Sequence, residues 1–192
     1  MSYRMLEFID RTSAAFRNAN SMQLKEVSNE ATREAVAGND RVFARIAVVA
    51  YSLSKLASKQ HFAESTSWGR TKKAILDSLE RLSQLLRKNR KEEFAAALNS
   101  FENEVRKVDA SLGNYVRNII EKAKVKVSSG AYAQGLSLSS AAELTGAGKT
   151  DLQNYIGITK IHDEEETKLF MTERMKKIRR IFSRSDSRNV VA

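Results

Sequence analysis

Apolar residues recur along the chain at intervals of three and four, the spacing that puts side chains on one side of an α-helix. The first four helices predicted from this pattern cover about residues 2–16, 22–37, 41–62 and 69–88, the last of them preceded by Trp68. Gly38 follows the second helix at a position that favours glycine, and Asp40 is placed to cap the third. The centre of the third helix, residues 46–56, is apolar on nearly every side. We therefore expect it to be buried among several neighbours.

The most regular pattern in the chain is a heptad seam. Its apolar positions alternate in spacing between four and three residues: Phe94, Leu98, Phe101, Val105, Val108, Leu112, Tyr115 and Ile119. A seam of this kind packs along another helix of the same chain or pairs between two subunits. The two bulky phenylalanines and the absence of a clean set of charged flanking positions favour packing within the chain. Gly113 interrupts the seam and is a natural domain boundary.

Residues 137–156 read SLSSAAELTGAGKTDLQNYI and have the spacing of a helix-turn-helix. Gly135 ends the preceding helix and Ser137 is placed to cap the next one. Two helices that cross steeply need a small residue where they come closest, which Ala142 supplies. Gly146 supplies a residue that tolerates positive φ at the turn. These features predict a unit of three helices.

The second short helix of this segment has an apolar and a polar side. Leu152 and Ile156 are four residues apart and can face a shared core. The predicted DNA-contacting residues are Lys149, Thr150, Gln153 and Asn154, with Lys160 just beyond the helix. Glutamine and asparagine can bond adenine in the major groove, whereas lysine and threonine at a helix start suit phosphate. Asp151 lies among them and opposes binding. Exposed faces of short helices are polar by default, so contact with a protein is the alternative interpretation.

The run S-x-x-x-A-A-E-L-x-G that begins at Ser137 resembles the helix-turn-helix units of prokaryotic transcription regulators. With its continuation GITKIHDEE, it is also similar to a group of uncharacterised archaeal proteins regarded as DNA-binding transcription regulators. A second block, VVAYSLSKLASKQHF at residues 48–62, resembles a helical segment of the same group. The resemblance implies DNA binding and transcription regulation. In this chain Gly148 stands where a hydroxyl N-cap is usual, so the second helix lacks that side-chain acceptor.

Composition supports an all-α fold without catalytic chemistry. The 192 residues include no proline and no cysteine, which suits long uninterrupted helices and excludes disulfides and thiolate sites. His61 and His162 are the only histidines and lie far apart in sequence. No phosphate-binding glycine loop, HExxH or G-x-S-x-G motif occurs, so we predict no enzyme activity, metal or cofactor. The longest apolar run is too short to span a membrane, and a cytoplasmic protein is expected.

The formal net charge of +10 and a pI near 9.9 indicate affinity for polyanions. The charge is dispersed along the chain. Residues 70–91 hold eight basic and two acidic residues, and residues 174–184 hold six basic and no acidic residues. Most such runs are solvated helix faces. The first run also leaves RNA binding as an alternative function.

Four segments follow from these patterns. We predict a helical bundle over residues 1–112, a helix-turn-helix unit over 113–160, a basic C-terminal helix over 161–184 and a disordered tail over 185–192. The predicted function is DNA binding in transcription regulation, with the bundle forming a homodimer or contacting a protein partner. The alternatives are RNA binding and an adaptor or antitoxin-like protein-interaction module in which the helix-turn-helix is structural.

Overall fold

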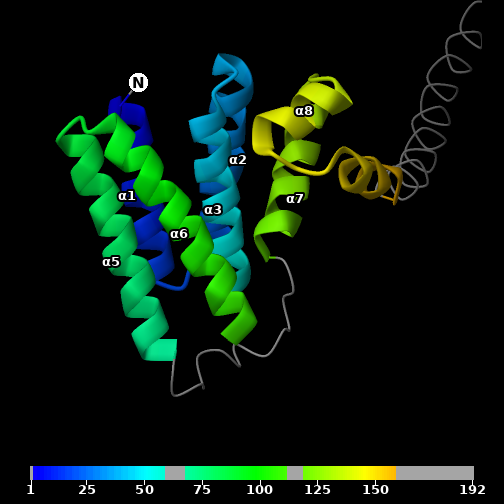
Figure 1. Cartoon of the computed structure of the whole chain (residues 1–192). Coiled ribbons are helices and arrows are strands. Elements are labelled where there is room, and N and C mark those ends of the chain that lie inside the picture. Colours follow the sequence, from blue (N-terminus) through cyan, green and yellow to red (C-terminus); the bar gives the residue numbers. More distant parts are fainter. Residues whose placement is uncertain (1, 59–67, 112–118, 159–192) are drawn as a thin grey trace, which may run out of the picture. The chain divides into compact units, whose positions relative to one another are not determined.

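The computed structural model describes residues 2–58, 68–111 and 119–158, and all regular structure in these ranges is helical (Figure 1). The labelled helices are α1 (Ser2–Arg17), α2 (Ser21–Gly38), α3 (Arg41–Ala57), α5 (Trp68–Arg87), α6 (Lys91–Ser111), α7 (Ile119–Ala133) and α8 (Leu138–Thr145). A further helix covers residues 149–158. No strand occurs in the described residues, which confirms the predicted all-α class.

The chain divides into two compact units, Met1–Leu152 and Gln153–Ala192. The helices α1 to α8 all belong to the first unit, and their packing is that of the first unit alone. Within it, α1, α5 and α6 lie on one side of α2 and α3, and α7 and α8 lie on the other (Figure 1). The predicted boundary near Gly113 falls in residues 112–118, outside the described residues.

Helix α3 is the centre of the first unit. It contacts α1, α2, α6, α7 and α8, as its apolar sequence predicts. Its buried residues occupy all sides of the helix: Phe43, Ala44, Ile46, Ala47, Val48, Val49, Ala50, Ser52, Leu53, Ser54 and Leu56. The small side chains among them let neighbours approach closely, and Ser28 of α2 donates a hydrogen bond to the carbonyl oxygen of Ala47 at 2.8 Å. Despite this apolarity, none of the helices in the described part of the chain has the length and apolar character needed to cross a membrane.

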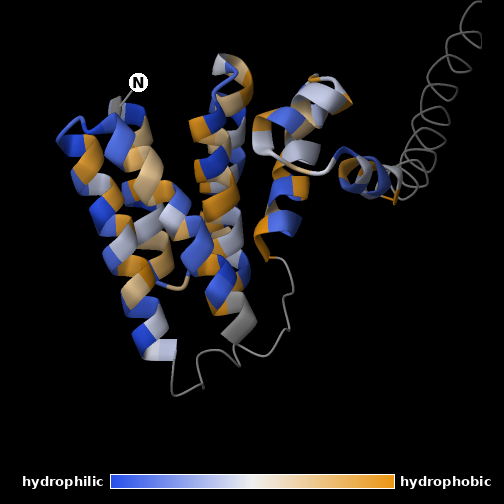
Figure 2. Ribbon diagram, viewed as in Figure 1, coloured by the Kyte–Doolittle hydropathy of each residue, from blue (hydrophilic) through white to orange (hydrophobic). Residues whose placement is uncertain are grey.

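The heptad seam packs within the first unit. Phe94, Leu98, Phe101 and Val105 are at most 3% exposed, and α6 contacts α5, α7 and α3. Hydrophobic and hydrophilic residues alternate along α5, whose apolar side faces α1 and α6 (Figure 2). The intramolecular interpretation of the seam is therefore confirmed for these four positions and for Ile119, which is 2% exposed, whereas Val108 is half-buried. Leu112 and Tyr115 lie outside the described residues.

Tight turns join most of the consecutive helices. A residue with positive φ follows each of α1, α2, α5 and α7: Ala19 at 50°, Asn39 at 46°, Asn89 at 55° and Gly135 at 102°. The next residue then donates its N–H to a carbonyl five positions back, as Asp40 does to Ala35 at 2.9 Å. This is the Schellman arrangement, which satisfies the last carbonyls of a helix.

Two predicted helix ends were wrong. The left-handed residue after α2 is Asn39, and Gly38 is the last residue of the helix. Asparagine tolerates this conformation because its short polar side chain can bond locally. Helix α3 ends at Ala57 with Ser58 as its C-cap, short of the predicted Phe62. The Asp40 cap is confirmed, since its carboxylate accepts from the N–H of Val42 at 2.7 Å and of Phe43 at 3.4 Å.

The remaining predictions about chain organisation fall outside the described residues. These are the rest of the block at 48–62 beyond Ser58, the basic helix at 161–184 and the tail at 185–192.

Helices α1 and α2 are joined by a bidentate ion pair. The two Nη atoms of Arg11 donate to the carboxylate oxygens of Glu30 at 2.7 and 2.9 Å. These hydrogen bonds hold the pKa of Glu30 below its usual range and raise the pKa of Arg11. Both side chains are more than one third exposed, so solvent screens the pair.

The lowered pKa of Glu30 makes its contribution to stability depend on pH. The contribution is complete above the pKa of an unfolded glutamate, about 4.3, and is lost as the pH falls through the lower folded value. We expect Glu30→Gln to lower the free energy of unfolding at pH 7 by less than about 1 kcal/mol and the difference from wild type to shrink below pH 4. Urea denaturation at both pH values measures this. Glu26→Gln, an exposed carboxylate of the same helix, is the control, and an equal effect of the two changes would contradict the assignment.

Candidate nucleic-acid interface

The connector between α7 and α8 has the predicted construction. Gly135 takes the left-handed conformation that ends α7, and the N–H of Leu136 donates to the carbonyl oxygen of Ala131 at 3.4 Å. Ser137 then caps α8, because its hydroxyl accepts the N–H of Ser140 at 3.1 Å. These local bonds fix where α8 begins.

The end of α8 is set by Gly146. Its φ of 71° and ψ of 28° are left-handed, and its N–H bonds the carbonyl oxygen of Ala142. The N–H of Ala147 also donates to Ala142, at 3.0 Å. No heavy atom lies within 4 Å of a Cβ placed on Gly146, so the requirement for glycine comes from the backbone conformation alone.

Buried hydroxyl groups join α7 to α8. Ser128 of α7 is fully buried, and its hydroxyl donates to the carbonyl oxygen of Ala141 at 3.2 Å. It also makes a short hydrogen bond with the hydroxyl of Thr145. Thr145 in turn accepts the N–H of Ala147 at 3.3 Å, inside the turn. The sequence patterns did not predict this chain of bonds, although a serine on the apolar side of a helix was a signal that could have found it.

Helix α8 is also tied to α3. Arg41 of α3 donates to Glu143 of α8 at 2.5 Å, and both side chains are about two thirds exposed or more, at 66% and 73%. Beside this ion pair lies a cavity of about 240 Å³, lined by Arg41, Arg45, Val48, Glu102, Lys124, Glu143, Leu144, Thr145 and Gly146. The ion pair is too exposed to add more than about 1 kcal/mol.

The predicted DNA-contacting residues lie on the helix at residues 149–158. Lys149 and Thr150 are exposed in its first turn, and Gln153 and Asn154 are exposed in the next. Their spacing of three and four residues places them on one side of a helix. Leu152 and Ile156 are buried, as their spacing predicted. Lys160 lies outside the described residues.

Asp151 lies against the start of this helix. A Cβ placed on Gly148 would come within 2.6 Å of the Asp151 carboxylate, so that side chain occupies the space beside the glycine. A negative charge in the first turn of a helix interacts favourably with the helix dipole. The acidic residue therefore stabilises a helix start that has no hydroxyl cap, while placing a negative charge beside Lys149 and Thr150.

No metal-binding cluster of three or more histidine, cysteine, aspartate or glutamate side chains is present among the described residues. His61 and His162 both lie outside them.

No protein-family model matches the chain, and neither a curated protein nor a solved structure is significantly similar to it.

The left-handed turn after α8 predicts a specific cost for Gly146→Ala. An alanine at φ 71° is strained, so we expect the free energy of unfolding to fall by about 1–2 kcal/mol. Gly69→Ala is the matched control, because Gly69 is helical and a Cβ added there would meet no heavy atom within 4 Å; there alanine is expected to be neutral or stabilising. Urea denaturation followed by circular dichroism compares the two. A loss of the same size at both sites would contradict the assignment.

Proposed function

We propose that the protein is a sequence-directed DNA-binding protein that acts in transcription regulation. In this proposal α8 and the helix at residues 149–158 form a helix-turn-helix, and the second of these helices reads the major groove. The observation that carries the proposal is the left-handed Gly146 followed by a helix with four exposed phosphate- or base-bonding side chains. The net charge of +10 supports a polyanionic partner.

Each exposed residue has a distinct role in this proposal. Lys149 and Thr150, in the first turn, bind phosphates and set the register of the helix on the duplex. Gln153 and Asn154 bond base edges, each with an amide that can donate and accept at the same adenine. Lys160 adds a phosphate contact.

A homodimer fits this function best. One helix presents only two base-bonding side chains, and such a unit gains useful affinity when two copies bind half-sites about one DNA turn apart, roughly 34 Å. The bundle of α1 to α6 supplies the surface available for dimerisation or for a protein partner.

A protein-interaction module is the second candidate function. It is favoured by the packing of α8 on α3 and by the Arg41–Glu143 ion pair, which give α8 a structural role in the bundle. In that case Gln153 and Asn154 have no DNA to read.

The double change Gln153→Ala and Asn154→Ala separates these functions. We expect it to lower affinity for a preferred genomic fragment by about tenfold or more, since each bidentate base contact contributes about 1–3 kcal/mol of discrimination. Affinity for random duplex DNA and its salt dependence should not change. Fluorescence anisotropy on selected and random fragments at several salt concentrations measures both.

The matched control is Gln23→Ala with Asn29→Ala, which removes the same two residue types from exposed positions of α2. This control should leave binding unchanged. The proposal fails if wild-type protein prefers no fragment, or if both double variants bind the preferred fragment equally well.

Removing the charge of Asp151 is expected to raise the affinity for DNA, whereas the preceding change lowers it. Asp151→Asn keeps the side-chain shape beside Gly148 and removes a negative charge from the proposed phosphate contact. Because one charge a few ångströms away in water is worth about 1 kcal/mol, affinity for all duplexes should rise by roughly two- to fivefold. The same titrations measure this, with Glu26→Gln on α2 as the control. Unchanged affinity in Asp151→Asn would place the start of this helix away from the DNA backbone.

A further inference from the structure

Exposed cations follow the outer side of α5, the turn after it and the first residue of α6. Five basic side chains in this segment are exposed and make no ion pair or side-chain hydrogen bond within the described part of the chain: Arg70, Lys73, Arg81, Lys88 and Lys91. Their neighbours are engaged. Arg87 pairs with Asp10 at 3.2 Å, and the Lys72 ammonium donates to the carbonyl oxygen of Arg17 at 2.9 Å. The five exposed cations are therefore distinct from those that hold the bundle together.

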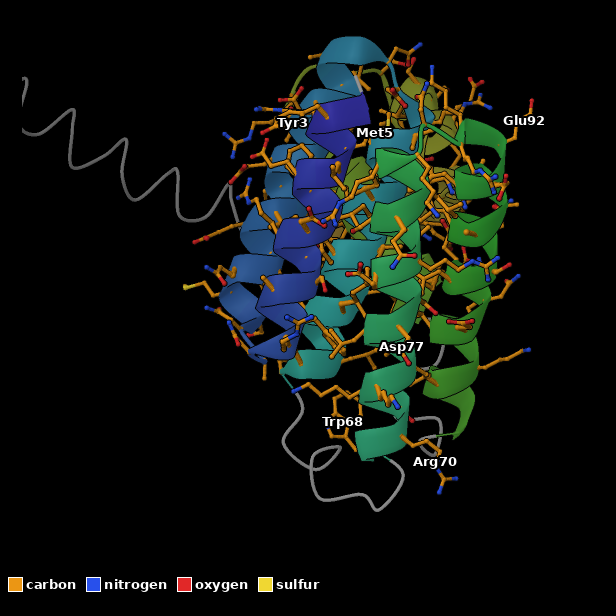
Figure 3. All side chains as sticks on the ribbon, turned by 90° about the vertical axis from the view of Figure 1, so that its left-hand side faces the viewer. Tyr3, Met5, Trp68, Arg70, Asp77 and Glu92 are labelled. Atoms are coloured by element: carbon orange, nitrogen blue, oxygen red, sulfur yellow. The ribbon has the colours of Figure 1, made fainter. Side chains whose placement is uncertain are left out.

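The buried side of α5 fixes the direction in which these cations point. Ile75, Leu79 and Leu82 are at most 1% exposed and face the core. The opposite side of the helix is consequently held toward solvent, and Arg70 extends from one end of it (Figure 3). A helix of 20 residues is about 30 Å long. The cations thus form an extended, rigid array and not a local cluster.

A neighbouring helix contributes to the same surface at one end. Arg70 and Lys107 of α6 both line a cavity of about 290 Å³ between α5 and α6. Glu104, the acidic residue in this lining, accepts a hydrogen bond from Ser78 at 2.7 Å. Lys107 is exposed, so two cations from different helices border one hollow. We call these six residues the α5 surface: Arg70, Lys73, Arg81, Lys88, Lys91 and Lys107.

We propose that the α5 surface binds the phosphate backbone of duplex DNA without reading its sequence. An extended row of cations complements the regular charge of a duplex. A helix that lies on a membrane needs an exposed apolar face, whereas the apolar face of α5 is buried. Binding of single strands relies on exposed aromatic rings for base stacking. Trp68, the aromatic residue at the start of α5, is half-buried and packs edge-on against Phe16, with ring centroids 6.3 Å apart.

Exposed acidic residues limit the affinity of this surface. Asp77 and Glu80 are exposed on α5, and Glu92 is exposed next to Lys91. Asp77 is seven residues after Arg70 and four before Arg81, so helical spacing places it on the same side of α5 as both. Figure 3 shows Asp77 and Arg70 along this helix. Their charge opposes phosphate, so binding is expected to be weak and strongly dependent on salt. The surface is independent of the helix at residues 149–158 and does not rest on the function proposed for it.

The test uses the full-length protein and a random-sequence duplex of about 30 base pairs, titrated by fluorescence anisotropy at several salt concentrations. The double change Arg70→Gln and Lys73→Gln should lower affinity. It should also reduce the slope of log K against log salt by up to about 1.8, since each phosphate contact contributes roughly 0.9. The control is Arg33→Gln with Lys25→Gln, which removes one arginine and one lysine from exposed positions of α2. It should change the slope by much less.

A second variant is expected to bind the duplex more tightly than wild type. Asp77→Asn should raise duplex affinity several-fold, a result that damage to the fold cannot produce. The proposal is overturned if the α5 and α2 double variants lose affinity equally, or if Asp77→Asn has no effect. It is also overturned if the α5 changes weaken binding to single-stranded RNA or to anionic phosphatidylserine vesicles while duplex binding is unchanged.

The same binding experiments distinguish this proposal from the proposal that Gln153 and Asn154 read base edges. Changes on the α5 surface should weaken binding to preferred and random fragments alike, whereas loss of Gln153 and Asn154 should affect only the preferred fragment.

Discussion

Burial of α3 is the constraint on which the first unit depends. A helix that is apolar on nearly every side cannot be covered by one neighbour, and α1, α2, α6, α7 and α8 all contact it. Alanines at 44, 47 and 50 allow these helices to come close, and the Ser28 hydroxyl bonds directly to the α3 backbone. Helices α7 and α8 therefore belong to the same packed unit as the bundle. The first helix of the candidate helix-turn-helix is consequently held in place by this core.

Short turns let consecutive helices pack side by side, although the chain has no proline and few glycines. Each left-handed residue reverses the chain within two or three positions, and the residue after it can cap the next helix, as Asp40 does. Asparagine, which tolerates this conformation, fills the role at residues 39 and 89, and alanine accepts the strain at residue 19. Gly135 and Gly146 fill it around α8 without strain. The turns on both sides of α8 thus place no non-glycine residue at positive φ.

Sequence patterns predicted the helices well because the spacing of apolar residues along a helix can be read from neighbouring residues. The all-α class, the starts of α2, α3 and α5, the Ser137 cap and the Gly146 turn follow from neighbouring residues alone. The α2 end was missed because Gly38 and Asn39 both tolerate the left-handed conformation, so residue type alone does not say which of them follows the helix. The Arg41–Glu143 pair spans 102 residues, and no local pattern records such a contact. The Ser128–Thr145 bond was missed for another reason: a hydroxyl in a helix is usually solvated, and the position of Ser128 on the apolar side of α7 was not used as a signal.

Ion pairs between helices determine which of the cations behind the net charge of +10 are neutralised and which are left exposed to a ligand. Several acidic residues are used between helices, in the pairs Arg4–Glu34, Arg11–Glu30, Arg45–Glu102, Arg87–Asp10 and Arg106–Glu121. These carboxylates neutralise cations that join α1, α2, α3, α5, α6 and α7. The cations of the α5 surface and Lys149 take no part in these pairs. Among the described residues, accessible positive charge therefore lies along the outer side of α5 and at the start of the helix at residue 149, and also at single positions elsewhere, such as Lys25 and Arg33 of α2 and Lys122 of α7.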